Sequence, residues 1–362
     1  MLEDILKLSQ AFIRIRSTAE SKDKLDEILK LALSYLNNYT VERFENEGKP
    51  SALIYKANTR PSKFKLILNG HLDVVPGRED LYEPRIEGDK LIGVGALDMK
   101  ASAACLIYAF LNMVDKVSYP LGLQLVTDEE IGGFNGTKYQ ILNGVTADFV
   151  ICGEPTNFDI VNKAKGIIWL KINFKGITAH GAYPWRGKNA ILLAHNFLSK
   201  LFKRFNNPKE AKWQTTINLA RIETSNNAFN KIPDDCTIWL DIRYTPEDKD
   251  RVLQEIHQIL PKDTSVEIMF NEPSLYTEEN NVFIQNLTKS IKFIIQTSTQ
   301  IRYANGSSDA RHYMNINVPG IEFGPVGGNI GGDEEWVSIK GLEQYFEILQ
   351  DFLLRIDSDR EN

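Results

Sequence analysis

The chain has 362 residues with 43% hydrophobic and 25% charged side chains, a composition typical of a globular protein, and its length favours two domains over a single core. The net charge of −6 argues against a nucleic-acid-binding protein, which would need a strongly basic face. The three cysteines are odd in number and lack C-x-x-C spacing, so we expect buried thiols in a reducing compartment.

The first predicted element is an amphipathic helix over residues 2–15, in which charged residues recur at helical spacing. Because this segment contains no uninterrupted apolar stretch, we expect neither a secretion signal nor a membrane span. The expected location is cytoplasmic.

Up to about residue 165 the chain alternates predicted helices, over 22–36 and 101–114, with short apolar runs. This alternation is typical of an α/β domain, and continuous apolar runs of this kind are typical of buried parallel strands. The runs lie at residues 65–70, 121–127 and 148–153.

From Ile167 onward apolar and polar residues alternate, which predicts a strand with one buried face. The elements that follow are a helix over 190–205, strands over 215–222 and 237–243, a helix over 248–260 and a strand over 265–270. The resulting order β-α-β-β-α-β is that of a ferredoxin-like unit. The first pattern then resumes with a helix over 281–295, a strand over 318–323 and a helix over 342–355.

The sequence therefore predicts an α/β fold with two parts. A discontinuous domain of residues 1–165 and 274–362 would contain a mostly parallel mixed sheet, and a ferredoxin-like domain of residues 166–273 would be inserted into it.

Each of the three apolar runs ends in side chains that bind metals. His71 and Asp73 follow the first run, Asp128, Glu129 and Glu130 follow the second, and Glu154 follows the third; Asp98 lies in the Gly-rich turn 93–100. Ligands of open α/β sheets gather at the carboxyl ends of the strands. One imidazole and several carboxylates at such an edge are what a hydrolytic two-metal site requires.

Each residue also has a simpler interpretation. His71 and Asp73 are compatible with a hydrogen-bonded loop, in which Asp73 would hold the second imidazole nitrogen of His71. Three successive acids are often a solvated turn. Asp98 is compatible with a helix N-cap, and Glu154 with an ordinary strand exit.

Four motifs in chain order resemble one family: Gly70-His-Leu-Asp-Val-Val-Pro76, Gly95-Ala-Leu-Asp-Met-Lys100, Thr127-Asp-Glu-Glu-Ile-Gly132 and Cys152-Gly-Glu-Pro-Thr156. The sequence is similar to the co-catalytic zinc peptidase and deacylase family of succinyl-diaminopimelate desuccinylase, acetylornithine deacetylase, aminoacylase and carboxypeptidase G. The resemblance covers nearly the whole chain. It implies a zinc-peptidase-like catalytic domain and an inserted lid domain that dimerises.

The resemblance also implies a role for each motif residue. His71 and Glu154 would bind one zinc ion, Glu130 would bind a second, and Asp98 would bridge the two, often through a cis peptide to the next residue. Glu129 would be the general base, and Asp73 would orient His71. Co²⁺ or Mn²⁺ are possible substitutes for Zn²⁺.

Further motifs resemble the family's substrate-binding elements. In Gly176-Ile-Thr-Ala-His-Gly-Ala-Tyr-Pro184, His180 would stabilise an oxyanion in the partner subunit's site; its simpler interpretation is a packed strand-end histidine. Asn230 and Arg243 would bind a substrate carboxylate, although an Arg in this context is more often a surface ion pair. Ser307 and Ser308 are further candidate substrate contacts.

One expected ligand is missing. Relatives place a zinc-binding histidine in their final motif, and the aligned position is Gly331; the five histidines are His71, His180, His195, His257 and His312. Asp333, Glu334 or water would have to complete the second site, or the metal of Glu130 binds weakly, or catalysis has been lost.

The favoured function is zinc-dependent hydrolysis of the amide bond of N-acyl amino acids or small peptides, with Glu129 as base toward a metal-activated water. The expected partners are a small-molecule substrate and a second copy of the chain, with no nucleic acid and no membrane. The alternative is a metal-compromised homologue that binds amino-acid-like ligands without efficient turnover. A nucleotide-binding enzyme is less favoured, because Gly93-Val-Gly95 lacks the full G-x-G-x-x-G pattern.

Overall fold

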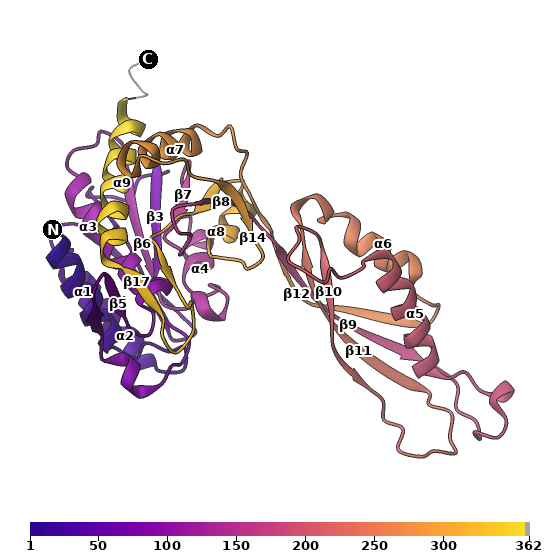
Figure 1. Ribbon diagram of the computed structural model, residues 1–362. Helices are drawn as coiled ribbons and strands as arrows, with labels where there is room; N and C mark the ends of the chain where they lie inside the picture. Colours follow the sequence, from indigo (N-terminus) through magenta and orange to yellow (C-terminus); the bar gives the residue numbers. More distant parts are fainter. Residues whose placement is uncertain (359–362) are drawn as a thin grey trace. The chain divides into compact units, whose positions relative to one another are not determined.

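The computed structural model describes residues 1–358 and divides the chain into two compact units (Figure 1). The first unit comprises residues 1–163, 276–303 and the chain from residue 308, and the second comprises residues 164–275 and 304–307. Within the described residues, every helix is too short or too polar to cross a bilayer.

The described part of the first unit is built on a mixed nine-stranded sheet. Its strand order is β1-β2-β6-β3-β7-β15-β8-β13, with β14 paired to β8. Strands β6, β3, β7 and β15 run parallel, whereas β1 and β2 pair antiparallel with their neighbours and β8 pairs antiparallel with β15. The bounds are β1 (Thr40–Asn46), β2 (Lys49–Tyr55), β3 (Leu66–His71), β6 (Leu121–Val126), β7 (Val150–Cys152), β8 (Ile160–Ala164), β13 (Leu275–Tyr276), β14 (Ile301–Ala304) and β15 (Gly320–Glu322).

Helix α3 (Ala101–Met113) is the central helix of this unit. It is apolar on nearly all sides and packs against β3, β6, α1 and α9, as expected of a helix buried all round. The other helices are α1 (Leu2–Arg14), α2 (Lys22–Ser34), α4 (Thr137–Leu142), α7 (Val282–Ile295), α8 (Ala310–Tyr313) and α9 (Ile339–Ser358).

A second, small sheet brings residues 327–338 next to the Gly-rich turn 93–100. Its order is β16-β17-β5-β4, with β4 (Arg85–Glu87), β5 (Lys90–Ile92), β16 (Gly327–Gly328) and β17 (Trp336–Ser338). Strand β17 also packs against the turn Ala96–Lys100. The loop that contains Gly331 is therefore fixed beside Asp98.

The second unit runs β9-α5-β10-β11-α6-β12, and its antiparallel sheet has the order β10-β11-β9-β12. Helices α5 and α6 pack together, and their apolar residues share one core with the sheet. The bounds are β9 (Gly166–Lys175), α5 (Ala190–Arg204), β10 (Thr216–Glu223), β11 (Asp235–Tyr244), α6 (Arg251–Ile259) and β12 (Thr264–Glu272).

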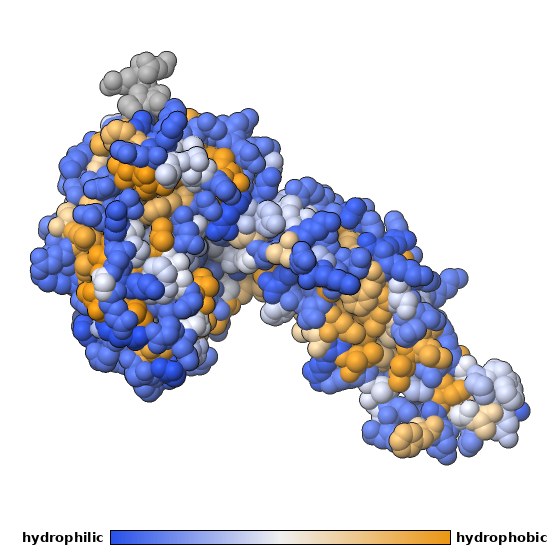
Figure 2. Space-filling view, viewed as in Figure 1, coloured by the Kyte–Doolittle hydropathy of each residue, from blue (hydrophilic) through white to orange (hydrophobic). Residues whose placement is uncertain are grey.

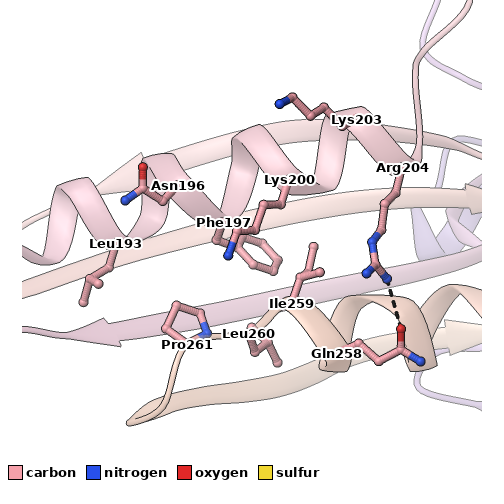
Figure 3. A pocket seen from close by; sticks show the side chains of 10 residues that line it. All are labelled: Leu193, Asn196, Phe197, Lys200, Lys203, Arg204, Gln258, Ile259, Leu260 and Pro261. Carbon is pink, nitrogen blue, oxygen red and sulfur yellow. Dashed lines mark hydrogen bonds between the residues drawn. The ribbon is translucent and has the colours of Figure 1, made fainter.

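A surface groove runs along the seam where α5 meets α6 and the residues that follow α6 (Figure 3). Apolar side chains such as Leu193 and Leu260 line it together with Lys200, and Arg204 of α5 donates a hydrogen bond to Gln258 of α6 at 3.1 Å. None of the predicted site residues lines this groove, so it is separate from the site that the sequence predicts.

The predicted α/β fold class is confirmed, and the expected helices and strands form with small shifts at their ends. Helix α6 begins at Arg251 rather than at residue 248, and α9 begins at Ile339 rather than at residue 342. The hairpin β1–β2 and the small sheet were not identified from the sequence.

Candidate metal centre

The parallel strands β3, β6 and β7 deliver the predicted ligands to one edge of the sheet. His71 is the last residue of β3 and pairs in register with Val126, the last residue of β6. Cys152, the last residue of β7, pairs with Asn69 of β3. The acids after β6 and Glu154 after β7 therefore leave the sheet on the same side as His71, as expected at the carboxyl ends of parallel strands.

Three side chains meet there closely enough to share one cation. His71 Nε2 lies 3.1 Å from Asp98 Oδ1 and 3.9 Å from Glu154 Oε1. One donor atom from each residue lies within 4.8 Å of the other two, and this is the only such His/Cys/Asp/Glu group among the described residues. One imidazole nitrogen and two carboxylate oxygens are a donor set that zinc accepts, so the residues fit a metal.

The backbone orients His71 for this role. Its Nδ1 faces the main-chain carbonyl of Asp73 at 3.0 Å, and a carbonyl can only accept. Nδ1 therefore donates its proton, which leaves the lone pair of Nε2 for a metal. Burial lowers the pKa of His71, but hydrogen bonds to Asp73 and Asp98 outweigh it and raise that pKa well above its usual value.

The Asp73 carboxylate does something that the sequence did not indicate. It lies 3.6 Å from His71 Nδ1, whereas it accepts hydrogen bonds from the backbone N–H of Glu129 at 3.2 Å and of Glu130 at 3.0 Å. Asp73 therefore faces His71 Nδ1 with its main-chain oxygen and, at a longer distance, with its carboxylate, and the same carboxylate binds the turn that carries the two glutamates.

A buried carboxylate binds the backbone at Asp98. Glu335, which is 3% exposed, accepts hydrogen bonds from Leu97 N at 2.7 Å and from Asp98 N at 2.9 Å. The peptide bond from Asp98 to Met99 is cis. Helix α3 has Lys100 as its N-cap, so the interpretation of Asp98 as a helix cap is wrong.

The two glutamates have strongly perturbed acidity. Burial raises the pKa of Glu129 well above its usual value, and the positive charge of His71 opposes this. Burial raises the pKa of Glu130 to about 7. Carboxyl groups shifted toward neutral pH can hold and release a proton under physiological conditions.

The predicted substrate-binding residues of the second unit lie mostly at its surface. His180 is exposed, and its Nδ1 accepts a hydrogen bond from Ala182 N at 3.1 Å, which leaves Nε2–H as an outward donor. Asn230 is exposed. Arg243 makes a bidentate ion pair with Asp241, with Nε–Oδ1 at 2.9 Å and Nη2–Oδ2 at 3.2 Å.

The two serines belong to different units. Ser307 is half-buried in the second unit, and Ser308 is buried in the first. Ser308 lies beside Glu322, a buried residue of β15 whose pKa burial raises to about 7.

Sequence reasoning missed Glu335 and Glu322. Glu335 belongs to three successive acids, and nothing in that run distinguishes the buried carboxylate from its exposed neighbours Asp333 and Glu334. Glu322 lies within an apolar run, and a charged residue at that position was the signal that could have identified it.

Comparison with known proteins decides the family. A model described as Peptidase family M20/M25/M40 matches residues 67–355. The chain belongs to this peptidase family. The resemblance found from the four motifs is therefore confirmed, and the chain is an M20-family hydrolase that acts on amide or peptide bonds.

Individual proteins resemble this M20 chain in sequence or in fold. A curated succinyl-diaminopimelate desuccinylase from Pelagibacter ubique is 31% identical over 350 residues, which cover 85% of this chain and 88% of the relative. The crystal structure of the aminopeptidase PepT from Bacillus cereus superposes with a TM-score of 0.79 at 18% identity and covers 98% of both chains. A Bacillus subtilis protein described as a dinuclear metal binding peptidase of the M20 family has a TM-score of 0.68 at 13% identity, covering 99% of this chain and 98% of its own.

Proposed function

We propose that this M20 protein is a zinc-dependent hydrolase that cleaves the amide bond of N-acyl amino acids or small peptides. One observation supports this most strongly: His71, Asp98 and Glu154 converge within 4.8 Å at the ligand edge of the sheet. Desuccinylation is the first activity to test, since a desuccinylase is among the similar curated proteins.

In this proposal His71, Asp98 and Glu154 hold the metal, with Co²⁺ or Mn²⁺ as substitutes for Zn²⁺. When bound, a divalent ion supplies Lewis-acid polarisation of the amide carbonyl and lowers the pKa of a water from about 15.7 toward 7. The family resemblance assigns Glu130 to a second metal, together with Asp98.

Glu129 acts as the general base. Its carboxylate takes a proton from the attacking water and delivers it to the leaving amine, so that the C–N bond breaks with a neutral amine as product. Its turn is fixed by the Asp73 carboxylate through two backbone hydrogen bonds, which makes Asp73 a positioning residue. A general base of this kind contributes about a hundredfold to ten-thousandfold in rate.

The second unit contributes substrate recognition in this proposal. The outward Nε2–H of His180 is a donor suited to the developing oxyanion. Arg243 binds the free carboxylate of the substrate with Asn230, in exchange for its present pairing with Asp241, and Ser307 and Ser308 add polar contacts.

We further propose that the second unit, as a lid, mediates a homodimer and that the enzyme is cytoplasmic. Figure 2 shows apolar residues at the surface of this unit, and its exposed apolar side chains include Ile177, Leu192, Phe229 and Met269. Apolar surface of this kind is typical of interaction sites. Light scattering tests the dimer, and a monomer at working concentration would contradict it.

The test of the proposed reaction is Glu129→Gln, assayed against N-succinyl and N-acetyl amino acids and dipeptides. We expect unchanged metal content by mass spectrometry and a loss of turnover by a hundredfold or more. Glu3→Gln, at an exposed residue of α1 with no proposed role in the site, is the control and should retain both. Full turnover in Glu129→Gln would refute its role as base.

A second candidate function follows from Gly331, which leaves Glu130 without its expected histidine partner. In this alternative the protein binds amino-acid-like ligands without efficient turnover. Calorimetric binding of an N-acyl amino acid with no turnover in the whole panel would favour it.

A further inference from the structure

The two halves of the predicted two-metal site are unequal. His71, Asp98 and Glu154 form a complete group of three donors. Among residues 1–358, no His, Cys, Asp or Glu joins Glu130 and Asp98 to make a second group of three. The residues therefore fit one cation and do not fit a second in the same way.

The three acids that follow Gly331 in the sequence already have partners. Asp333 pairs with Arg78 at 3.3 Å, and Glu334 pairs with Arg85. Glu335 is buried and already accepts hydrogen bonds from three backbone N–H groups: those of Leu97, Asp98 and Gly331. Of these acids, the two exposed ones are held only by weak surface ion pairs, so both remain able to move toward a metal.

Gly331 marks the place where a ligand side chain is absent. An added Cβ there would meet only one atom within 4 Å, Val75 Cγ2 at 4.0 Å. The backbone N–H of Val75 in turn donates to the Glu130 carboxylate. Gly331 N also binds Glu335, which holds Asp98. Gly331 is thus connected to Glu130 through Val75 and to Asp98 through Glu335, and these are the two residues that a second metal would use.

We propose that this protein binds one divalent cation tightly, at His71, Asp98 and Glu154, and that Gly331 is the reason that the Glu130 side binds a second one weakly. This inference rests on the metal site of the proposed function. Losing a direct ligand costs at least as much affinity as losing an outer partner, which is worth about tenfold to a hundredfold. We therefore expect the second equivalent to bind at least about tenfold to a hundredfold more weakly than the first.

The test measures zinc stoichiometry rather than activity. The metal-free full-length protein is titrated with Zn²⁺ against a chelating dye, and bound zinc is counted by mass spectrometry after dialysis. The wild type should retain one equivalent, and His71→Ala should lose it. Gly331→His should gain a second tight equivalent, and adding Glu130→Gln to that variant should remove the gain.

Gly88→His is the matched control. Gly88 has φ +58° and Gly331 has φ +64°, and an added Cβ at Gly88 meets nothing within 4 Å. Histidine tolerates the left-handed backbone region better than most residues. Gly88→His should therefore stay at one equivalent, and its thermal melting reports the cost of the substitution alone. Gly331→Asp provides a second route to the added ligand if Gly331→His does not fold.

The outcomes separate the two proposals. No zinc on the wild type would refute the metal site itself. Two tight equivalents on the wild type would overturn the single-metal inference, and a fall to one in Asp333→Asn/Glu334→Gln would identify those acids as the extra ligands. One equivalent on both Gly331 variants would also overturn the inference, because the gap would then not lie at Gly331.

Discussion

Glu335 offers the most informative single perturbation outside the metal ligands. Its carboxylate accepts hydrogen bonds from Leu97 N at 2.7 Å, Asp98 N at 2.9 Å and Gly331 N at 3.3 Å. Glu335→Ala leaves these donors without their acceptor. An unsatisfied buried donor costs about 1–3 kcal/mol.

The expected loss of stability is smaller than the summed cost of three unsatisfied donors. Burial raises the pKa of Glu335, so removing its charge recovers part of the free energy. We therefore expect Glu335→Ala to lower the free energy of unfolding by about 2–4 kcal/mol. Because Asp98 is no longer fixed, zinc affinity should also fall by about tenfold to a hundredfold. Glu335→Gln keeps one acceptor oxygen and should lose about 1 kcal/mol.

Urea unfolding and zinc competition measure both effects. Glu334→Ala is the control, because Glu334 is an exposed neighbour in a surface ion pair and should change stability by less than about 0.5 kcal/mol. Equal stability and equal zinc affinity in the Glu335→Ala and Glu334→Ala proteins would refute the role of Glu335 as the support of Asp98.

Three further predictions concern charge. Burial raises the pKa of Glu322 from its ordinary value of 4.5 to about 7, so its carboxyl lowers the stability of the metal-free fold as pH rises from about 4.5 to about 7, and the full loss is present above that. Glu322→Gln should stabilise that fold by up to about 3 kcal/mol at pH 8 and by almost nothing at pH 4, whereas a pH-independent difference in urea unfolding would contradict the shift. The pKa values of His71 and Glu154 are raised, and both must lose protons to bind zinc, so zinc affinity should fall more than about tenfold from pH 8 to pH 6; a flat titration would oppose this. Arg243→Ala should raise KM about tenfold or more for substrates with a free carboxylate and leave their C-amidated analogues unaffected, and equal effects on both would exclude a carboxylate contact.

The strands of the first unit were predictable because burial on both faces produces continuous apolar runs. Leu66–His71 and Leu121–Val126 are fully buried, so their ends could be placed at a common edge. The convergence of His71, Asp98 and Glu154 followed from that placement and from the family resemblance.

The features that escaped prediction depend on contacts that local patterns do not encode. The Asp73 carboxylate binds a turn 56 residues away, and Glu335 binds a turn more than 230 residues away. The hairpin β1–β2 turns at Glu47 and Gly48, with φ 49° and 72°. Strand β1 is rich in polar residues, so it shows no clear alternation of apolar and polar side chains. Helix α9 begins before Gly341, a residue that usually marks a helix end.

The most direct test of the account is a crystal structure of the protein grown with Zn²⁺ and measured at the zinc absorption edge. We expect an anomalous peak bound by His71 Nε2 and by carboxylate oxygens of Asp98 and Glu154, with Glu129 facing the open side of the ion. A zinc peak elsewhere, with these three side chains bonded only to one another, would contradict a metal-dependent hydrolase built on this site.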